Sequence, residues 1–257
     1  MPLEKEIEEK SQEISTDAYS MSVGELVALY RDNELDIHPE FQRFFRWTLG
    51  QKTRFIESLL LGIPVPSIFV SQTVIGKWDV VDGLQRISTV LELMGELKNQ
   101  EGAFLPSLKL RGTKYLPSLE GMVWRKANPS DIELPLMAKL KIKRARFDIK
   151  IVLSTSDPKS KYELFQRLNT GGSIATDQEV RNCILIMVNR PFYQWTDSLN
   201  SDPNFQACLP LSERQLNEQF DMELVARFLT LRSLNLEASP KIEELGSFLT
   251  EEIIKMA

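Results

Sequence analysis

Five consecutive residues, Asp82-Gly83-Leu84-Gln85-Arg86, place a carboxylate, a glycine, an amide and a guanidinium within one short segment. They follow the apolar Val80-Val81 and precede apolar residues at helical spacing, so they predict a strand-to-helix turn. The first backbone N–H groups of a helix have no partner within the helix and carry partial positive charge, which suits an anion. This turn therefore predicts a phosphate or nucleotide site.

Each residue of the turn except Leu84 has a distinct role in such a site. Arg86 can hold a phosphate through two parallel hydrogen bonds, and Gln85 can orient a water molecule or a base edge. Asp82 can hold a magnesium ion or activate water beside the phosphate, and Gly83 lets the backbone approach the ligand closely. Asp82, Gln85 and Arg86 are thus candidate catalytic residues. The alternative is a helix that Asp82 caps, followed by a solvated Arg86.

A second candidate segment, Phe41–Trp47, combines four aromatic residues with Gln42, Arg43 and Arg46. Aromatic faces suit a nucleotide base and guanidinium groups suit its phosphates. Gln42, Arg43 and Arg46 are therefore candidate nucleotide-binding residues. The alternative is a core aromatic cluster whose arginines extend outward to solvent.

The third candidate segment lies at Phe165–Gly172, where a predicted helix ends at Asn169 and is followed by a glycine pair. Glycines let backbone amides approach a ligand, so Asn169 and Gly172 are candidate nucleotide-binding residues. The alternative is an ordinary helix end followed by a loop.

A run of basic residues could follow the backbone of a nucleic acid. Five such residues fall within eight positions: Lys139, Lys141, Lys143, Arg144 and Arg146. The alternative is a solvated face with no ligand. Asp131 and the triplet Asp148-Ile149-Lys150 weakly match the spacing of metal-dependent nucleases, although Asp-x-Lys is common by chance.

Composition limits the classes of protein that remain. The 257-residue chain has a net charge of −5, which excludes a uniformly basic DNA-binding surface but permits local basic patches. His38 is the only histidine, so a site built from several histidines is excluded, and we assign His38 a structural role. Cys183 and Cys208 form no Cys-x-x-Cys pair, which argues against a zinc site.

The hydrophobic pattern offers no membrane segment, because no apolar run reaches the about 20 residues that a membrane helix needs. The acidic N-terminus differs from a signal peptide, so we expect a cytoplasmic protein.

Capping and periodicity predict the elements that position these residues. Ser22-x-x-Glu25 and Thr176-x-x-Glu179 are capping boxes, and Gly62 suits a helix end. Residues 98–130 are expected to be irregular, with short helical or strand pieces. The predicted helices span 22–33, 48–61, 85–97, 158–168, 176–188, 191–200, 212–218, 221–235 and 240–256, and the predicted strands span 35–37, 67–72, 77–81 and 146–154.

The distribution of these elements indicates the α+β class. The strands at 67–72 and 77–81 form a hairpin, and only helices follow residue 155. We expect a flexible lead at 1–18, an α+β nucleotide-binding core at 19–155 and a helical domain at 156–257.

Four segments in this order resemble the N-terminal domain of GmrSD-type restriction endonucleases. They are Phe41-Gln42-Arg43 with Trp47, Leu60-x-Gly62-Ile63-Pro64-x-Pro66, Val81-Asp82-Gly83-Leu84-Gln85-Arg86, and Phe165-x-x-Leu168-Asn169-x-x-Gly172 with Glu179. Asp-Gly-x-Gln-Arg is the most specific of them, and the family usually has Gln at the position of Leu84. The resemblance covers roughly residues 20–190 of this sequence.

The resemblance implies a ParB/sulfiredoxin-like fold, a small mixed sheet with helices. It also implies a nucleotide-binding, nucleotide-hydrolysing module of a prokaryotic restriction or anti-phage system that acts on foreign or modified DNA. A nucleoside triphosphate of unidentified base, with magnesium, is the expected ligand. In many members a His-containing nuclease domain follows, on the same chain or on a partner. Because this sequence has one histidine, we expect any cutting activity elsewhere.

Two other functions remain open. One is a module without catalysis that binds DNA or a partner nuclease through the basic run and the helical C-terminal third. The weaker one is a metal-dependent DNA nuclease.

Overall fold

The computed structural model describes Leu3 and residues 15–37, 47–99, 101–153, 176–234 and 244–257. The chain divides into two compact units, Met1–Lys161 and Tyr162–Ala257. Within the described ranges, no helix is both long and apolar enough to cross a membrane.

The first unit contains a five-stranded mixed sheet in the order β1-β7-β3-β4-β2. The predicted hairpin is confirmed, since β3 and β4 pair antiparallel, whereas β3 pairs parallel with β7 and β2 pairs parallel with β4. Strand β1 lies antiparallel to β7 at one edge. The strands are β1 (Thr16–Ser22), β2 (Leu35–Asp36), β3 (Ile68–Gln72), β4 (Trp78–Asp82) and β7 (Arg146–Val152).

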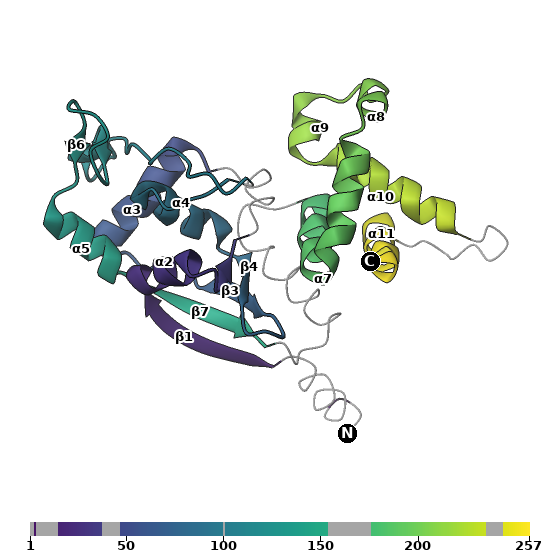
Figure 1. The fold of residues 1–257 in the computed structure, drawn as a ribbon, viewed down its shortest axis with the longest axis horizontal. Helices are drawn as coiled ribbons and strands as arrows, with labels where there is room; N and C mark the ends of the chain where they lie inside the picture. The colour runs from purple at the N-terminus through teal and green to yellow at the C-terminus, as the bar shows by residue number, and fades with distance from the viewer. Residues whose placement is uncertain (1–2, 4–14, 38–46, 100, 154–175, 235–243) are drawn as a thin grey trace. The chain divides into compact units, whose positions relative to one another are not determined.

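One face of this sheet forms the core. Alternate residues of β7 are buried and exposed: Phe147, Ile149 and Ile151 point inward, whereas Arg146, Asp148 and Lys150 are exposed. Helices α2 (Val23–Arg31), α3 (Leu49–Leu61) and α4 (Leu84–Met94) lie on the same side of β1 and β7 (Figure 1). The mixed sheet with helices confirms the predicted α+β class, and the ParB/sulfiredoxin-like topology stays a prediction.

Local capping sets most helix boundaries in this unit. The capping box at Ser22 starts α2 as predicted, and Gly62 in the left-handed conformation ends α3. The prediction that the helix after the Asp-Gly turn runs to residue 97 is wrong. It ends at Met94 because Gly95 adopts a left-handed conformation that closes the last turn.

The segment between α4 and β7 is irregular with short pieces, as predicted, and then forms a helix that the sequence did not predict. It contains a 3-10 turn at Pro117–Leu119 and the two-residue parallel strands β5 (Met122–Val123) and β6 (Ile132–Glu133). Helix α5 (Leu136–Arg144) follows and carries most of the basic run.

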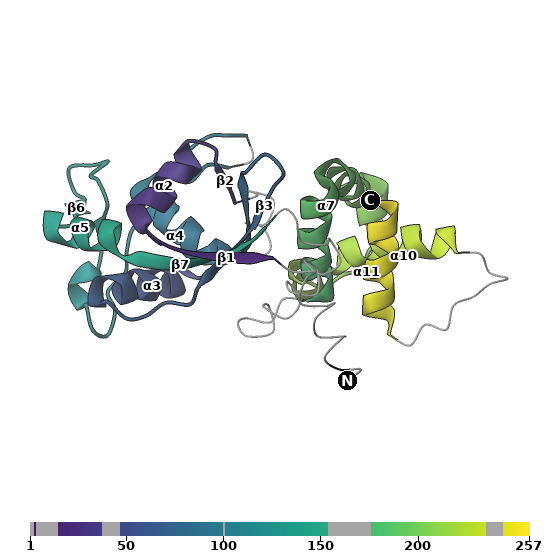
Figure 2. The same cartoon turned by 90° about the horizontal axis from the view of Figure 1, so that it is seen from below.

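Described residues of the second unit form only helices, in agreement with the predicted helical C-terminal part (Figure 2). The predicted helices at 176–188 and 191–200 form one element, kinked at Asn189 ahead of Pro191. The helix predicted at 158–168 lies outside the described residues, and α8 was not predicted. The elements are α7 (Asp177–Asn200), α8 (Pro203–Ala207), α9 (Glu213–Asn217), α10 (Phe220–Ser233) and α11 (Leu245–Met256).

Candidate functional site

The turn between β4 and α4 is capped by its glycine. Gly83 is the N-cap residue of α4, has φ +98°, and leaves the helix without a side-chain cap. A Cβ atom at Gly83 would lie 2.8 Å from Cγ1 of Ile68, so packing as well as backbone conformation requires glycine here. The alternative in which Asp82 caps the helix is therefore wrong.

Arg86 is buried, with its side chain only 10% exposed, and it joins three segments. One terminal nitrogen donates to the carbonyl oxygens of Pro66 and Ser67, at 2.5 and 3.0 Å. The other donates to Oδ2 of Asp82 at 2.7 Å. The alternative of a solvated Arg86 is wrong, because the guanidinium fixes the backbone before β3 against the end of β4.

Gln85 connects this turn to the aromatic segment. Its Oε1 accepts a hydrogen bond of 2.9 Å from the backbone N–H of Trp47. The Trp47 ring packs edge-on against Phe55 of α3, which in turn stacks on Phe147 of β7. The structure thus brings the end of the second candidate segment to the first turn of α4.

The remaining nucleotide-binding candidates of the aromatic segment and of the glycine-pair segment lie outside the described residues. They are Gln42, Arg43, Arg46, Asn169 and Gly172, and His38 is likewise outside. Leu84 is buried, so the position where the family usually has Gln serves packing in this chain.

Asp82 carries the only carboxylate of the turn, and its side chain is 34% exposed. Oδ2 binds Arg86, and Oδ1 has no hydrogen bond to another described residue. No group of three His, Cys, Asp or Glu residues that could hold a metal occurs among the residues that the structure describes. A magnesium ion at Asp82 would therefore need ligands from a nucleotide or from water.

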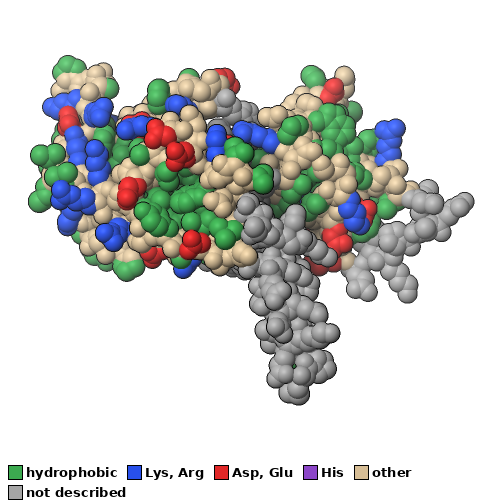
Figure 3. Space-filling model, turned by 60° about the horizontal axis from the view of Figure 1, so that its bottom comes forward, with side chains coloured by type: hydrophobic (Ala, Val, Ile, Leu, Met, Phe, Trp, Pro, Cys, Tyr) green, Lys and Arg blue, Asp and Glu red, His purple; other side chains and the backbone are tan. Residues whose placement is uncertain are grey.

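The basic run divides into residues whose side chains bond to other described segments and residues whose side chains do not. Lys139 pairs with Glu133 and lies 5.8 Å from the centroid of the Trp124 ring, and Lys141 donates to the carbonyl oxygen of Leu60 at 3.0 Å. The other three members, Lys143, Arg144 and Arg146, are exposed. In Figure 3, basic and apolar side chains are intermixed at the left end of the view, which carries α5.

The weak nuclease pattern finds little geometric support. Asp131 accepts hydrogen bonds from the backbone N–H of Asn128 and, more weakly, of Ala127, which lower the pKa of its carboxyl. Asp148 and Lys150 lie on the exposed face of β7. Asp131 therefore holds its own loop together.

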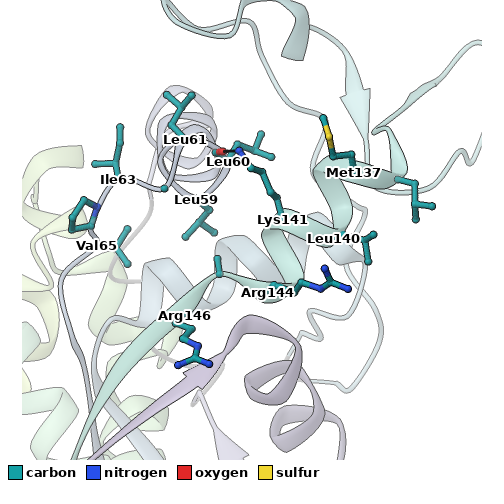
Figure 4. Close-up of a pocket in the computed structure, with 14 residues that line it drawn as sticks. Leu59, Leu60, Leu61, Ile63, Val65, Met137, Leu140, Lys141, Arg144 and Arg146 are labelled. Carbon is teal, nitrogen blue, oxygen red and sulfur yellow. Dashed lines mark hydrogen bonds between the residues drawn. The ribbon is translucent and has the colours of Figure 1, made fainter.

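Sequence reasoning missed a groove of about 670 Å³ between the end of α3, the loop at 62–65 and α5 (Figure 4). Its walls include the exposed apolar residues Ile63 and Met137, and its margin includes Arg144 and Arg146. The sequence did contain a signal for this groove. At helical spacing, the apolar residues Leu136, Met137 and Leu140 lie on a different side of the helix from the buried Ile142.

A mixed sheet covered on one face by helices, with a glycine-capped strand-to-helix turn, defines an α+β domain with a turn suited to an anion. The sequence profile of the GmrSD restriction endonuclease, N-terminal domain, matches residues 23–186. The chain belongs to this family and is a module of a restriction-type defence system, in which a partner nuclease domain is implied. No curated protein and no solved structure shows significant similarity to the chain.

Proposed function

We propose that the first unit binds a nucleoside triphosphate at the Asp82–Arg86 turn and hydrolyses it, as the nucleotide-dependent module of the restriction system. The observation that supports this most directly is the start of α4, which Gly83 caps without any side-chain hydrogen bond. Its first backbone N–H groups therefore have no side-chain partner among the described residues, and the helix dipole favours a phosphate there.

Asp82 is the residue that we assign to magnesium. Magnesium bound with nucleotides commonly uses one or two carboxylates, with phosphate oxygens and water completing its six ligands. A single carboxylate with one oxygen not engaged by Arg86 meets that requirement. In this role the ion would neutralise charge on the transferring phosphate, and Asp82 would orient it.

Arg86 and Gln85 act mainly by positioning in this proposal. Arg86 holds the carboxylate of Asp82, and its Nε and one further N–H donate to no described residue and would bind the phosphate. Gln85 holds the backbone of Trp47, which directly follows Arg46 in the chain. The candidates Gln42, Arg43, Arg46, Asn169 and Gly172 would complete the site from their two segments.

A thermal-shift panel of ATP, GTP, CTP and UTP, with and without magnesium, tests the proposal. A ligand at about 100 times its dissociation constant should stabilise the chain by about 2.7 kcal/mol. We expect a magnesium-dependent shift with at least one nucleotide, together with phosphate release. The absence of any shift would contradict nucleotide binding.

Asp82→Asn is the informative variant, because an amide oxygen can still accept the hydrogen bond from Arg86. The magnesium-dependent part of the shift and the phosphate release should be lost. Asp148→Asn, at an exposed position of β7, is the matched control and should behave like the wild type. Equal behaviour of the two variants would remove Asp82 from the site.

A second candidate function is a module without turnover that binds DNA, and the exposed Lys143, Arg144 and Arg146 favour it. Neutralising Lys141, Lys143 and Arg144 together would then abolish DNA binding, whereas Asp82→Ala would leave it unchanged. Cleavage of a plasmid by this chain alone with magnesium would instead favour a nuclease.

A further inference from the structure

The groove beside α5 has two apolar walls that are open to solvent. Leu61 and Ile63 form one wall and are 45% and 48% exposed, and Met137 on the opposite wall is 75% exposed. Figure 4 shows Leu61 and Ile63 on one side of the groove and Met137 and Leu140 on the other. Exposed apolar side chains gathered at one groove point to a binding site for another molecule.

Helix α5 carries more apolar surface than its own unit buries. Ile142 is fully buried in the unit, whereas Leu136 and Leu140 are 72% and 37% exposed. Leu136, Met137 and Leu140 have the spacing i, i+1 and i+4, which places them together on a second side of the helix. That side lines the groove opposite α3 and is only partly covered within the part of the chain that the structure describes.

Cations border the same groove. Lys141 of α5 reaches across to α3, where it donates to the carbonyl oxygen of Leu60. Arg144, at the end of α5, and Arg146, at the start of β7, both lie below the apolar side chains in Figure 4. Neither arginine forms a salt bridge with a described residue, and the carboxylate of Glu25 interacts with Arg146 only at longer range, so both guanidinium groups can receive an anion.

We propose that this groove binds an acidic amphipathic helix of a partner polypeptide. Apolar residues at i, i+3 or i+4 and i+7 would insert between the two walls, as in other helix-in-groove complexes. Acidic residues at one end of the helix would meet Arg144 and Arg146, which fixes its direction. This site is separate from the Asp82–Arg86 turn and does not depend on nucleotide binding there.

The apolar walls distinguish a polypeptide from DNA as the occupant. A DNA backbone needs cations on an accessible polar surface, and it gains nothing from the exposed side chains of Leu136, Met137 and Ile63. Lys143 sharpens the contrast, because it is exposed on α5 but does not line the groove.

Selection from a phage-displayed library of random peptides of about 16 residues, about 24 Å as a helix, tests the proposal on the full chain. Binders to the double variant Met137→Glu/Arg144→Glu are removed in each round. We expect enriched peptides with apolar residues at helical spacing and a net negative charge. Enrichment of basic peptides, or no enrichment over the double variant, would overturn the proposal.

Affinities of a synthetic consensus peptide then locate its contact. Met137→Glu and Arg144→Glu should each weaken binding about tenfold or more, since one inserts a charge between the walls and the other repels the acidic end. Leu136→Glu is a second wall variant if Met137→Glu alters the circular dichroism spectrum.

Two control variants introduce a glutamate at positions that do not line the groove. Lys143→Glu lies on the same helix, and Val74→Glu lies at the β3–β4 hairpin turn, where Val74 is 95% exposed. Both should leave peptide affinity unchanged. A DNA site would show the reverse pattern, with Lys143→Glu as damaging as Arg144→Glu and no peptide competing, and that result would also overturn the proposal.

Discussion

The Oε1 atom of Gln85 accepts a hydrogen bond of 2.9 Å from the backbone N–H of Trp47, 38 positions earlier in the chain. This bond joins two segments that the sequence marked separately as candidate nucleotide-binding regions. It also gives Gln85 a structural role that would operate with or without a ligand.

Replacing Gln85 by Leu should therefore release the Trp47 end of the aromatic segment. The Trp47 N–H would lose its acceptor, so the free energy of unfolding should fall by about 1 kcal/mol. Amide hydrogen exchange at Trp47 should accelerate. Gln85→Glu keeps an acceptor and is the control; if both variants exchange equally fast at Trp47, the hydrogen bond is not what holds this segment.

Gly83→Ala should destabilise the chain more than Gly76→Ala does. Both glycines have positive φ, of +98° and +86°, and an L-residue there costs about 1–2 kcal/mol. Only at Gly83 does the new Cβ meet another residue, Cγ1 of Ile68, which should add about 1–3 kcal/mol. Urea denaturation of the two variants gives the difference directly, and equal losses would show that the Ile68 contact relaxes without cost.

Arg86→Ala should cost about 3 kcal/mol of unfolding free energy, because it removes a buried ion pair and leaves two backbone carbonyls without their donor. Asp82→Asn should cost under about 1 kcal/mol, because Arg86 keeps an acceptor. Urea denaturation checks this order. The reverse order would show that Asp82, rather than the carbonyls of Pro66 and Ser67, supplies most of the stabilisation.

Glu96 should make the free energy of unfolding depend on pH in the acidic range. Arg31 donates to both of its carboxylate oxygens, at 3.0 and 2.5 Å, and thereby holds the pKa of Glu96 below its ordinary value. Because its pKa is lower in the folded state, ionised Glu96 adds to the free energy of unfolding above about pH 4.3, the ordinary pKa of Glu. That contribution is lost as the pH falls through the folded-state pKa.

Glu96→Gln should therefore lower the unfolding free energy near neutral pH and have little effect in strong acid. Arg31 is 56% exposed, so the loss should stay below about 1 kcal/mol. Urea denaturation at several pH values measures it. Arg31→Ala should remove the same pH-dependent contribution, and the double variant should lose no more than either alone; a larger loss would mean that Glu96 has another partner.

The local elements around the site were predictable because their determinants lie within three or four residues of one another. The capping boxes at Ser22 and Thr176 each start a helix where the sequence placed it. Gly83 identified the turn between a strand and a helix, and the turn is there. The hairpin of β3 and β4 was also predictable, because its two strands are neighbours in the chain.

The partners of the polar side chains were not predictable in the same way. Arg86 could have faced solvent or a phosphate by its spacing alone, yet its acceptors lie 19 and 20 positions away at Ser67 and Pro66. Likewise, Lys139 and Lys141 counted as members of a basic run, but contacts with Glu133 and Leu60 engage them.

The sequence by itself therefore determined the family, the α+β class and the strand-turn-helix junction at Asp82–Arg86, because near neighbours in the chain specify these features. Only the tertiary structure decided that Arg86 is buried, that Gln85 holds Trp47, and that apolar residues of α5 face an open groove. Those outcomes depend on which distant segments pack together. Packing, rather than spacing, selects the partner of each donor and acceptor.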